Sequence, residues 1–103
     1  MKISFINQIA DLCESLNTDV HFISRGIGLD KRIGDKFLHP GPGYGGSCFP
    51  KDTIALSKIA SDNDVDLSII NNVISYNENR KKSLIKKLNY ILGDRIREMS
   101  IAV

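Results

Sequence analysis

The sequence has little cysteine, almost no net charge and no long apolar run. Two cysteines among 103 residues are too few for a secreted disulfide scaffold. We therefore expect both thiols to be free, with a single Cys13–Cys48 disulfide as the alternative. A net charge of +2 at pH 7 gives no argument for nucleic acid or an anionic membrane as a partner. No apolar run approaches the ~20 residues that a membrane-spanning helix requires, so we expect binding to neither.

The first residues also lack a targeting pattern. Met1-Lys2-Ile3 leads at once into an amphipathic pattern, without the apolar middle and the small-residue cleavage site of a signal peptide. We therefore expect a cytoplasmic protein. A length of 103 residues favours one main domain with a small hydrophobic core.

Apolar residues recur at steps of three and four along most of the chain, which predicts an all-α fold. Asn17 is suited to end the first helix, Thr18 to cap the second, Asp52 or Thr53 to cap the third, and Gly93 to end the last. The longest helix carries an Asn-Arg-Lys-Lys stretch that we expect on a solvated face. The expected helices cover residues 3–17, 18–27, 53–62 and 67–92.

The two ends of the chain resemble pieces of larger elements. The first helical pattern is complete from its first residues and has no cap. The last residues, Glu-Met-Ser-Ile-Ala-Val, alternate and then become apolar, as at the start of a buried strand, but no partner strand is evident. We therefore expect both ends to be cut, with a helical domain over residues 1–93 and the start of another domain over 94–103.

One segment differs from the rest in composition. All three prolines lie between Pro40 and Pro50, and four of the eight glycines lie between residues 41 and 46. We expect residues 39–51 to be irregular, and we call residues 39–47 the glycine loop. Glycine lets another molecule approach the backbone closely, while proline limits the motion of the loop. Such a loop can offer its amides to a ligand.

Cys48 follows the glycine loop directly and precedes a predicted helix. A helix start and a neighbouring cation, here Lys51, both favour the reactive thiolate. Asp52 lies four residues further on, where a carboxylate can orient or deprotonate a water molecule. An ordinary turn beside an inert thiol is the alternative, because small-residue loops are common. Cys13 lies on an apolar helical stripe and is expected in the core.

The run Gly-Pro-Gly-Tyr-Gly-Gly-Ser-Cys-Phe-Pro-Lys-Asp-Thr resembles the signature of the UDP-glucose/GDP-mannose dehydrogenase family. The flanking segments FINQIADLCE, GIGLDKRIGDKFL, SYNENRK and REMSIAV resemble the same family, in order, over essentially the whole chain. Gln8 departs from the pattern, since the family usually has glutamate there. Members of this family oxidise the C6 alcohol of a nucleotide sugar to a carboxylate with two NAD⁺. The resemblance implies UDP-glucose as the substrate and a homodimer formed through the central helices.

The resemblance also implies residue roles. Cys48 is the expected nucleophile, which adds to the C6 aldehyde as a thiohemiacetal and then carries a thioester that water hydrolyses. Asp52 is expected to handle water and protons, and Arg32 to reach the substrate across the dimer interface. Cys48 and Lys51 are the expected cofactor contacts, and no metal site is expected. The expected substrate contacts are Arg32, Phe37, Leu38, His39, Gly43, Tyr44 and Gly45.

The family enzyme has two further domains, so the resemblance implies a part of an active site. Nothing in the sequence resembles the NAD-binding domain, and residues 94–103 resemble only the start of the UDP-binding domain. The family's catalytic lysine and its partner asparagine would precede Met1. We therefore expect the chain alone to be inactive. The alternatives are a non-catalytic helical interaction module left by a broken gene and, with less support, a cysteine hydrolase using His21 or His39.

Overall fold

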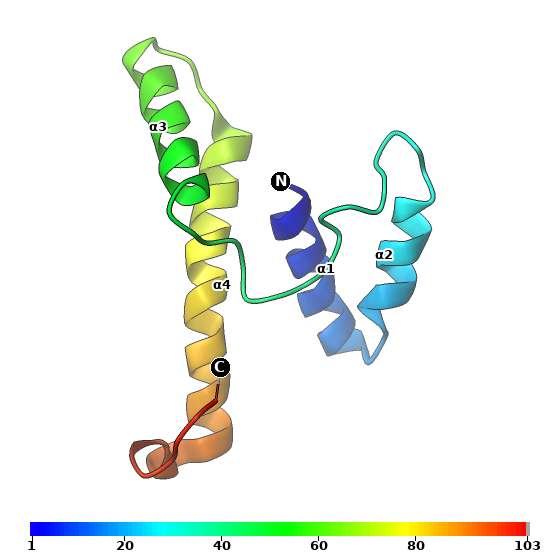
Figure 1. The fold of residues 1–103 in the computed structure, drawn as a ribbon, viewed down its shortest axis with the longest axis vertical. Coiled ribbons are helices and arrows are strands. Elements are labelled where there is room, and N and C mark those ends of the chain that lie inside the picture. The colour runs from blue at the N-terminus through cyan, green and yellow to red at the C-terminus, as the bar shows by residue number, and fades with distance from the viewer. Residues whose placement is uncertain (103) are drawn as a thin grey trace.

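Four α-helices and one 3-10 turn make up the computed structural model, which describes residues 1–102 (Figure 1). The all-α prediction is confirmed, with the longest helix near the C-terminus. The elements are α1 (Lys2–Leu16), α2 (Val20–Gly28), α3 (Phe49–Asp62), α4 (Ser68–Leu92) and the 3-10 turn η1 (Gly93–Arg97). Within residues 1–102 no helix is both long and apolar enough to cross a membrane.

Local chemistry at the helix ends explains most of these boundaries. Asn17 ends α1 in left-handed backbone with φ 53°, and Gly93 ends α4 with φ 53°, both as predicted. The cap predicted for α2 was wrong by one residue. Asp19, rather than Thr18, has extended backbone, and its carboxylate accepts a hydrogen bond of 2.9 Å from the His21 N–H. A cap needs both that conformation and a free first-turn N–H in reach.

Helix α3 begins earlier than predicted. It starts at Phe49, so Asp52 and Thr53 lie inside the helix and Cys48 occupies the cap position. Pro50 explains the difference, because proline fits the first turn of a helix, where its missing N–H would have no partner. The irregular segment therefore ends at Cys48 rather than at residue 51.

Helix α4 is the longest helix and contacts both α3 and α1. Helix α3 lies beside the first turns of α4, α1 contacts the middle of α4, and α2 packs on α1 away from α4 (Figure 1). The glycine loop leaves α2 by way of a turn, crosses α1 and reaches the start of α3 beside α4 (Figure 1). This path places the glycine loop between α1 and α4.

The core is small and the surface is large. The buried apolar side chains are Ile6, Cys13, Leu38, Tyr44 and Ala60. The chain exposes 8191 Å², whereas a folded monomer of 11.5 kDa exposes about 5,800 Å². Its radius of gyration is 16.5 Å against about 13 Å for a compact domain of this length. Much apolar surface therefore stays exposed in the isolated chain.

The strand expected at the C-terminus does not form in the part of the chain that the structure describes. Residues 98–102 have no regular secondary structure, and Val103 lies outside the described residues. A strand needs a neighbour to satisfy its backbone groups, and residues 1–102 contain no other strand to pair with.

Candidate active site

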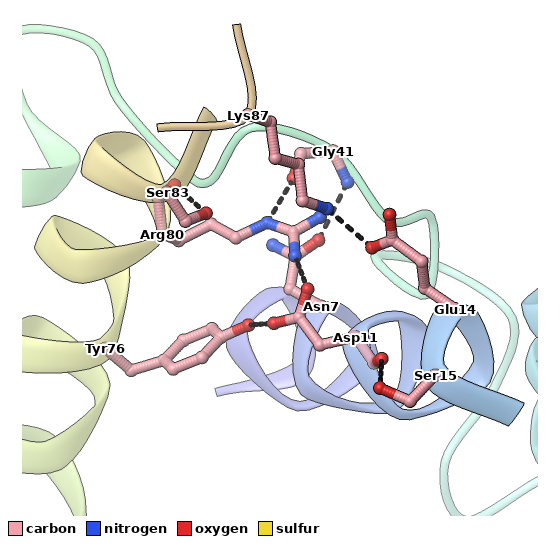
Figure 2. Close-up of polar contacts among 9 residues, drawn as sticks. All are labelled: Asn7, Asp11, Glu14, Ser15, Gly41, Tyr76, Arg80, Ser83 and Lys87. Carbon is pink, nitrogen blue, oxygen red and sulfur yellow. Dashed lines mark hydrogen bonds and ion pairs between the residues drawn. The ribbon is translucent and has the colours of Figure 1, made fainter. Parts of the chain in front are cut away.

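The glycine loop is irregular, yet side chains from α1 and α4 hold its backbone. The Gly41 N–H donates to Asn7 Oδ1 over 2.8 Å, and Arg80 Nε donates to the Gly41 carbonyl over 3.0 Å. Asn7 comes from α1 and Arg80 from α4 (Figure 2). Both polar groups of Gly41 are thus satisfied by side chains, as partly buried backbone groups require.

Asn77 of α4 makes a matching pair of bonds further along the loop. Its Oδ1 accepts from the Tyr44 N–H over 2.8 Å, and its Nδ2 donates to the Tyr44 carbonyl over 2.9 Å. Asn77 is 3% exposed. A Cβ on Gly43 would lie 2.6 Å from Asn77 Oδ1, and Gly43 has φ +114°. Only glycine fits there without strain.

An ion pair joins α1 to α4 beneath the loop (Figure 2). Arg80 Nη1 pairs with Asp11 Oδ1, and the Tyr76 hydroxyl donates to Asp11 Oδ2 over 2.8 Å. Burial, and then the hydrogen bond to the Asp11 carboxylate, raise the pKa of Tyr76 to about 12. The Arg80 side chain is only 10% exposed. The expectation that the whole Asn-Arg-Lys-Lys stretch is solvated was therefore wrong at Arg80.

Cys48 lies exposed at the cap position of α3, with Lys51 and Asp52 in the first turn. The Cys48 carbonyl accepts from the Asp52 N–H over 2.9 Å, the first bond of the helix. Ser47 Oγ lies 3.7 Å from Cys48 Sγ. Cys13 is buried, and both thiols are free, as predicted. The exposed thiol and the two charged residues therefore share one helix start.

Two neighbouring hollows border the glycine loop and the start of α1. One has a volume of about 520 Å³ and the other about 470 Å³, and Ile3 and Phe37 line both. Phe49, next to Cys48, lines the larger hollow, and its ring meets that of Tyr44 edge-on with centroids 5.2 Å apart. The predicted substrate contacts along these hollows are Phe37, His39, Gly43, Tyr44 and Gly45.

The other two predicted substrate contacts lie elsewhere. Leu38 is 1% exposed and packs in the core, and its carbonyl accepts a 2.6 Å hydrogen bond from Ser24 Oγ. Arg32 lies in the turn after α2, with its side chain 89% exposed and paired with Asp30 over 2.7 Å. The hydrogen bonds from Arg32 hold the pKa of Asp30 below its ordinary value. Neither side chain reaches the hollows within this chain.

A family model described as UDP-glucose/GDP-mannose dehydrogenase family, central domain, matches residues 1–79. The chain belongs to this family. The matched residues contain the glycine loop, Cys48 and α4 as far as Asn79. The resemblance noted in the sequence is thereby confirmed for the family.

Named relatives extend this similarity over the whole chain. The chain is 54% identical over 103 residues to a UDP-glucose 6-dehydrogenase of Rhizobium meliloti, covering 100% of this chain and 24% of that protein. It is 47% identical over 102 residues to a UDP-glucose 6-dehydrogenase of Rickettsia bellii, covering 99% of this chain and 24% of that protein. The chain thus spans about a quarter of the length of the curated relatives it matches.

A solved structure shares the fold. The structure of a UDP-glucose dehydrogenase from the hyperthermophilic archaeon Pyrobaculum islandicum superposes with a TM-score of 0.85 at 37% identity. The superposition covers 89% of this chain and 21% of the other. The helical arrangement in Figure 1 is therefore that of a segment within a larger dehydrogenase.

Sequence reasoning missed the side chains that hold the loop. Asn77 lies at helical spacing from Val73, Ile74 and Leu84 in the sequence of the longest helix, and Asn7 adjoins buried Ile6. An asparagine at an apolar stripe position is a usable signal, because a buried amide needs partners. Within residues 1–102 no group of three or more His, Cys, Asp or Glu side chains is arranged to hold a metal ion.

Proposed function

We propose that this chain is the central part of an NAD-dependent UDP-glucose 6-dehydrogenase, which converts UDP-glucose to UDP-glucuronate. The observation that carries the proposal is the placement of Cys48. It lies exposed at a helix start, directly after a glycine loop whose predicted substrate contacts line two hollows. Membership of the dehydrogenase family supports the same assignment.

In this proposal Cys48 Sγ adds to the C6 aldehyde of the sugar to give a thiohemiacetal. Loss of a hydride to NAD⁺ held by other domains, and of a proton, would turn this adduct into a thioester, which water then hydrolyses. Covalent capture divides a difficult oxidation into easier steps. Asp52, one helical turn from Cys48, orients the water and takes its proton. Because α3 begins at Phe49, its free N–H groups lie beside the reacting carbonyl and favour negative charge there.

The glycine loop supplies the substrate contacts. His39, Gly43, Tyr44 and Gly45 contact the nucleotide sugar along the hollows, and Phe37, which lines both hollows, is a further contact. Leu38 contributes by packing the loop in place. Arg32 lines neither hollow, and its exposed guanidinium suits a substrate diphosphate or carboxylate bound in a partner subunit.

Residues 1–102 do not by themselves fit the cofactor. They contain no strand, and hence no strand-and-helix unit of the kind that binds dinucleotides. Lys51 and Cys48 are exposed and would face NAD⁺ that is held mainly by other domains of the whole enzyme. When bound there, NAD⁺ would supply the oxidising capacity for the two oxidation steps. The chain alone is accordingly expected to produce no NADH.

The open apolar surface suits a homodimer. The chain exposes far more area than a compact monomer of its mass, and α4 contributes Ile69, Ile85 and Ile91 to that surface. A two-fold dimer would cover these side chains and is the commonest symmetry. Residues 1–93 would form the dimer and present the loop, while residues 94–103 begin the UDP-binding domain. The free thiols fit a cytoplasmic location.

The proposal is tested by exchanging this chain into an active relative. Residues 1–103 replace the aligned segment of the Rhizobium meliloti UDP-glucose 6-dehydrogenase, with which they share 54% identity. We expect the chimera to reduce NAD⁺ with UDP-glucose, and Cys48→Ala to abolish steady turnover. Cys13→Ala is the matched control, because its thiol is buried away from the loop.

The same experiment separates the proposal from the interaction-module alternative. A chimera that folds and assembles but forms no NADH would favour a segment that keeps the interface and has lost the chemistry. A chimera in which Cys48→Ala turns over normally would remove the nucleophile assignment. NADH formation by the isolated chain would show that residues 1–103 hold more of the active site than we propose.

A further inference from the structure

Two pairs of polar side chains face each other across the glycine loop. Asn7 and Asp11 lie one turn apart on α1, and Asn77 and Arg80 lie one turn apart on α4. Asn7 is 1% exposed, Asn77 is 3% exposed and the Arg80 side chain is 10% exposed. Such burial of amides and a guanidinium is rare unless their hydrogen bonds are satisfied. We call these four residues the polar clamp.

The polar clamp satisfies the loop backbone at two points. Gly41 donates to Asn7 and accepts from Arg80, and Tyr44 donates to and accepts from Asn77. The segment between these points consists of glycine and proline, which have no side chains able to hold it. The four bonds therefore decide the path of the loop between Gly41 and Tyr44.

The contact between Asn77 and Gly43 shows how closely the two parts fit. A Cβ on Gly43 would lie 2.6 Å from Asn77 Oδ1, closer than carbon and oxygen tolerate. A Cβ added to Gly45, by contrast, would have no other atom within 4 Å. The absence of a side chain at Gly43 thus serves the approach of Asn77, whereas Gly45 lines the larger hollow.

We propose that Asn77 and Arg80 are positioning residues of the active site, which act through the glycine loop rather than on the substrate. Neither lines either hollow. By fixing Gly41 and Tyr44 they set where Tyr44 and Gly45 face the substrate and where the chain turns toward Cys48. The inference rests on the proposed function, since positioning matters only if the loop receives a substrate. Because Asn77 and Arg80 lie on α4, a partner that packs on α4 would also influence the path of the glycine loop.

Amide hydrogen exchange on the full chain tests the polar clamp without any activity. Asn77→Leu removes both bonds to Tyr44 at similar volume, and Asn77→Asp keeps the acceptor for the Tyr44 N–H. Asn79→Leu, on an exposed face of the same helix, is the matched control. We expect exchange at the Tyr44 amide to rise about tenfold or more in Asn77→Leu, less in Asn77→Asp, and not at all in Asn79→Leu.

The pattern along the chain separates positioning from general stability. In Asn77→Leu the Tyr44 amide should lose the most protection and the Gly41 amide less, while the amides of α4 and α1 keep theirs. A uniform loss over all helices, or an unchanged Tyr44 amide, would overturn the polar clamp. If Asn77→Leu does not fold, Gly43→Ala probes the contact from the loop side. It should loosen the Tyr44 amide about tenfold, whereas Gly45→Ala should not.

Kinetics in the chimera then test the positioning role. Asn77→Asp should lower kcat/KM for UDP-glucose by about tenfold to 10²-fold, with Asn79→Leu unchanged, since small misplacements of substrate contacts are costly. Loss of loop protection with unchanged kcat/KM would overturn the positioning role. An inactive chimera with native Asn77 would instead overturn the proposed function, and hydrogen exchange would still decide whether the polar clamp exists.

Discussion

The glycine loop contains no helix or strand, whereas residues 81–92 of α4 form an unbroken helix, yet of the two only the loop contributes a buried side chain. Tyr44 in the loop is 8% exposed, and Leu38, directly before the loop, is 1% exposed. In α4, Tyr90 is 92% exposed and Ile91 is 74% exposed. In this chain the segment with regular backbone is therefore not the segment whose side chains are buried.

The difference follows from where each segment finds its hydrogen bonds. The end of α4 satisfies its backbone groups with partners only four residues away along the chain. The glycine loop takes its partners from α1 and α4, at separations of 33 to 39 residues. The path of the loop is therefore set by long-range contacts, while the end of α4 has a locally determined backbone and leaves apolar side chains such as Ile85 and Ile91 exposed.

The largest expected effect compares the two thiols. Cys48 is exposed beside the loop, whereas Cys13 is 3% exposed in the core. Iodoacetamide should label Cys48 faster by on the order of 10³-fold, because Cys13 reacts only when the structure opens. Mass spectrometry of partially labelled protein measures both rates. Urea at unfolding concentrations is the control and should make them similar. Equal rates in the folded chain would remove the case for a specially presented thiol.

Removal of Arg80 should break the well-packed region. Arg80→Met leaves the Gly41 carbonyl and the Asp11 carboxylate without their partner, which should lower the free energy of unfolding by about 2 kcal/mol. The exposed Lys82→Met, two residues on, should change it by less than about 0.5 kcal/mol. Urea denaturation followed by circular dichroism measures both. Equal effects would show that Arg80 is no better integrated than its solvated neighbour.

A charge on the exposed apolar face of α4 tests whether that face takes part in self-association. Ile91→Asp should weaken self-association about tenfold or more, because a buried interface disfavours an unpaired charge, and should barely change the unfolding free energy of the monomer. Asn89→Asp, exposed in the same turns, is the control. Sedimentation over a concentration series measures the dissociation constant. A purely monomeric chain at high concentration would contradict the dimer proposal.

The smallest expected effect is a pH dependence at Tyr76. Its pKa is about 12 in the fold against 10.0 ordinarily, because burial and then the Asp11 carboxylate disfavour the phenolate. The hydroxyl thus contributes stability that is complete below pH 10 and is lost as pH rises toward 12. Tyr76→Phe should lower the unfolding free energy by about 1 kcal/mol at neutral pH. The gap between the two proteins should close at alkaline pH, and a constant gap in urea titrations would contradict this.

Most features set by residues close together in the sequence were predicted, whereas features set by distant residues were not. Helix type and most ends were predicted, because Asn17 and Gly93 act on the turn they close. The start of α3 was misplaced although Pro50 carries a local signal for it. The burial of Arg80 could not be predicted from its neighbours, since Asp11 lies 69 residues away along the chain.

The sequence by itself determined the all-α architecture, the family and the unusual loop with its single exposed thiol. The architecture and the loop depend on periodicity, on helix caps and on glycine and proline, which act within a few residues. The family was identified from the resemblance of the glycine-rich run and its flanking segments. Only the tertiary structure decided which predicted contacts meet at the hollows, that Arg32 and Leu38 do not, and that Asn77 requires glycine at position 43. The physical reason is distance along the chain: α1 and α4 must first pack before their polar side chains can bind the loop between them.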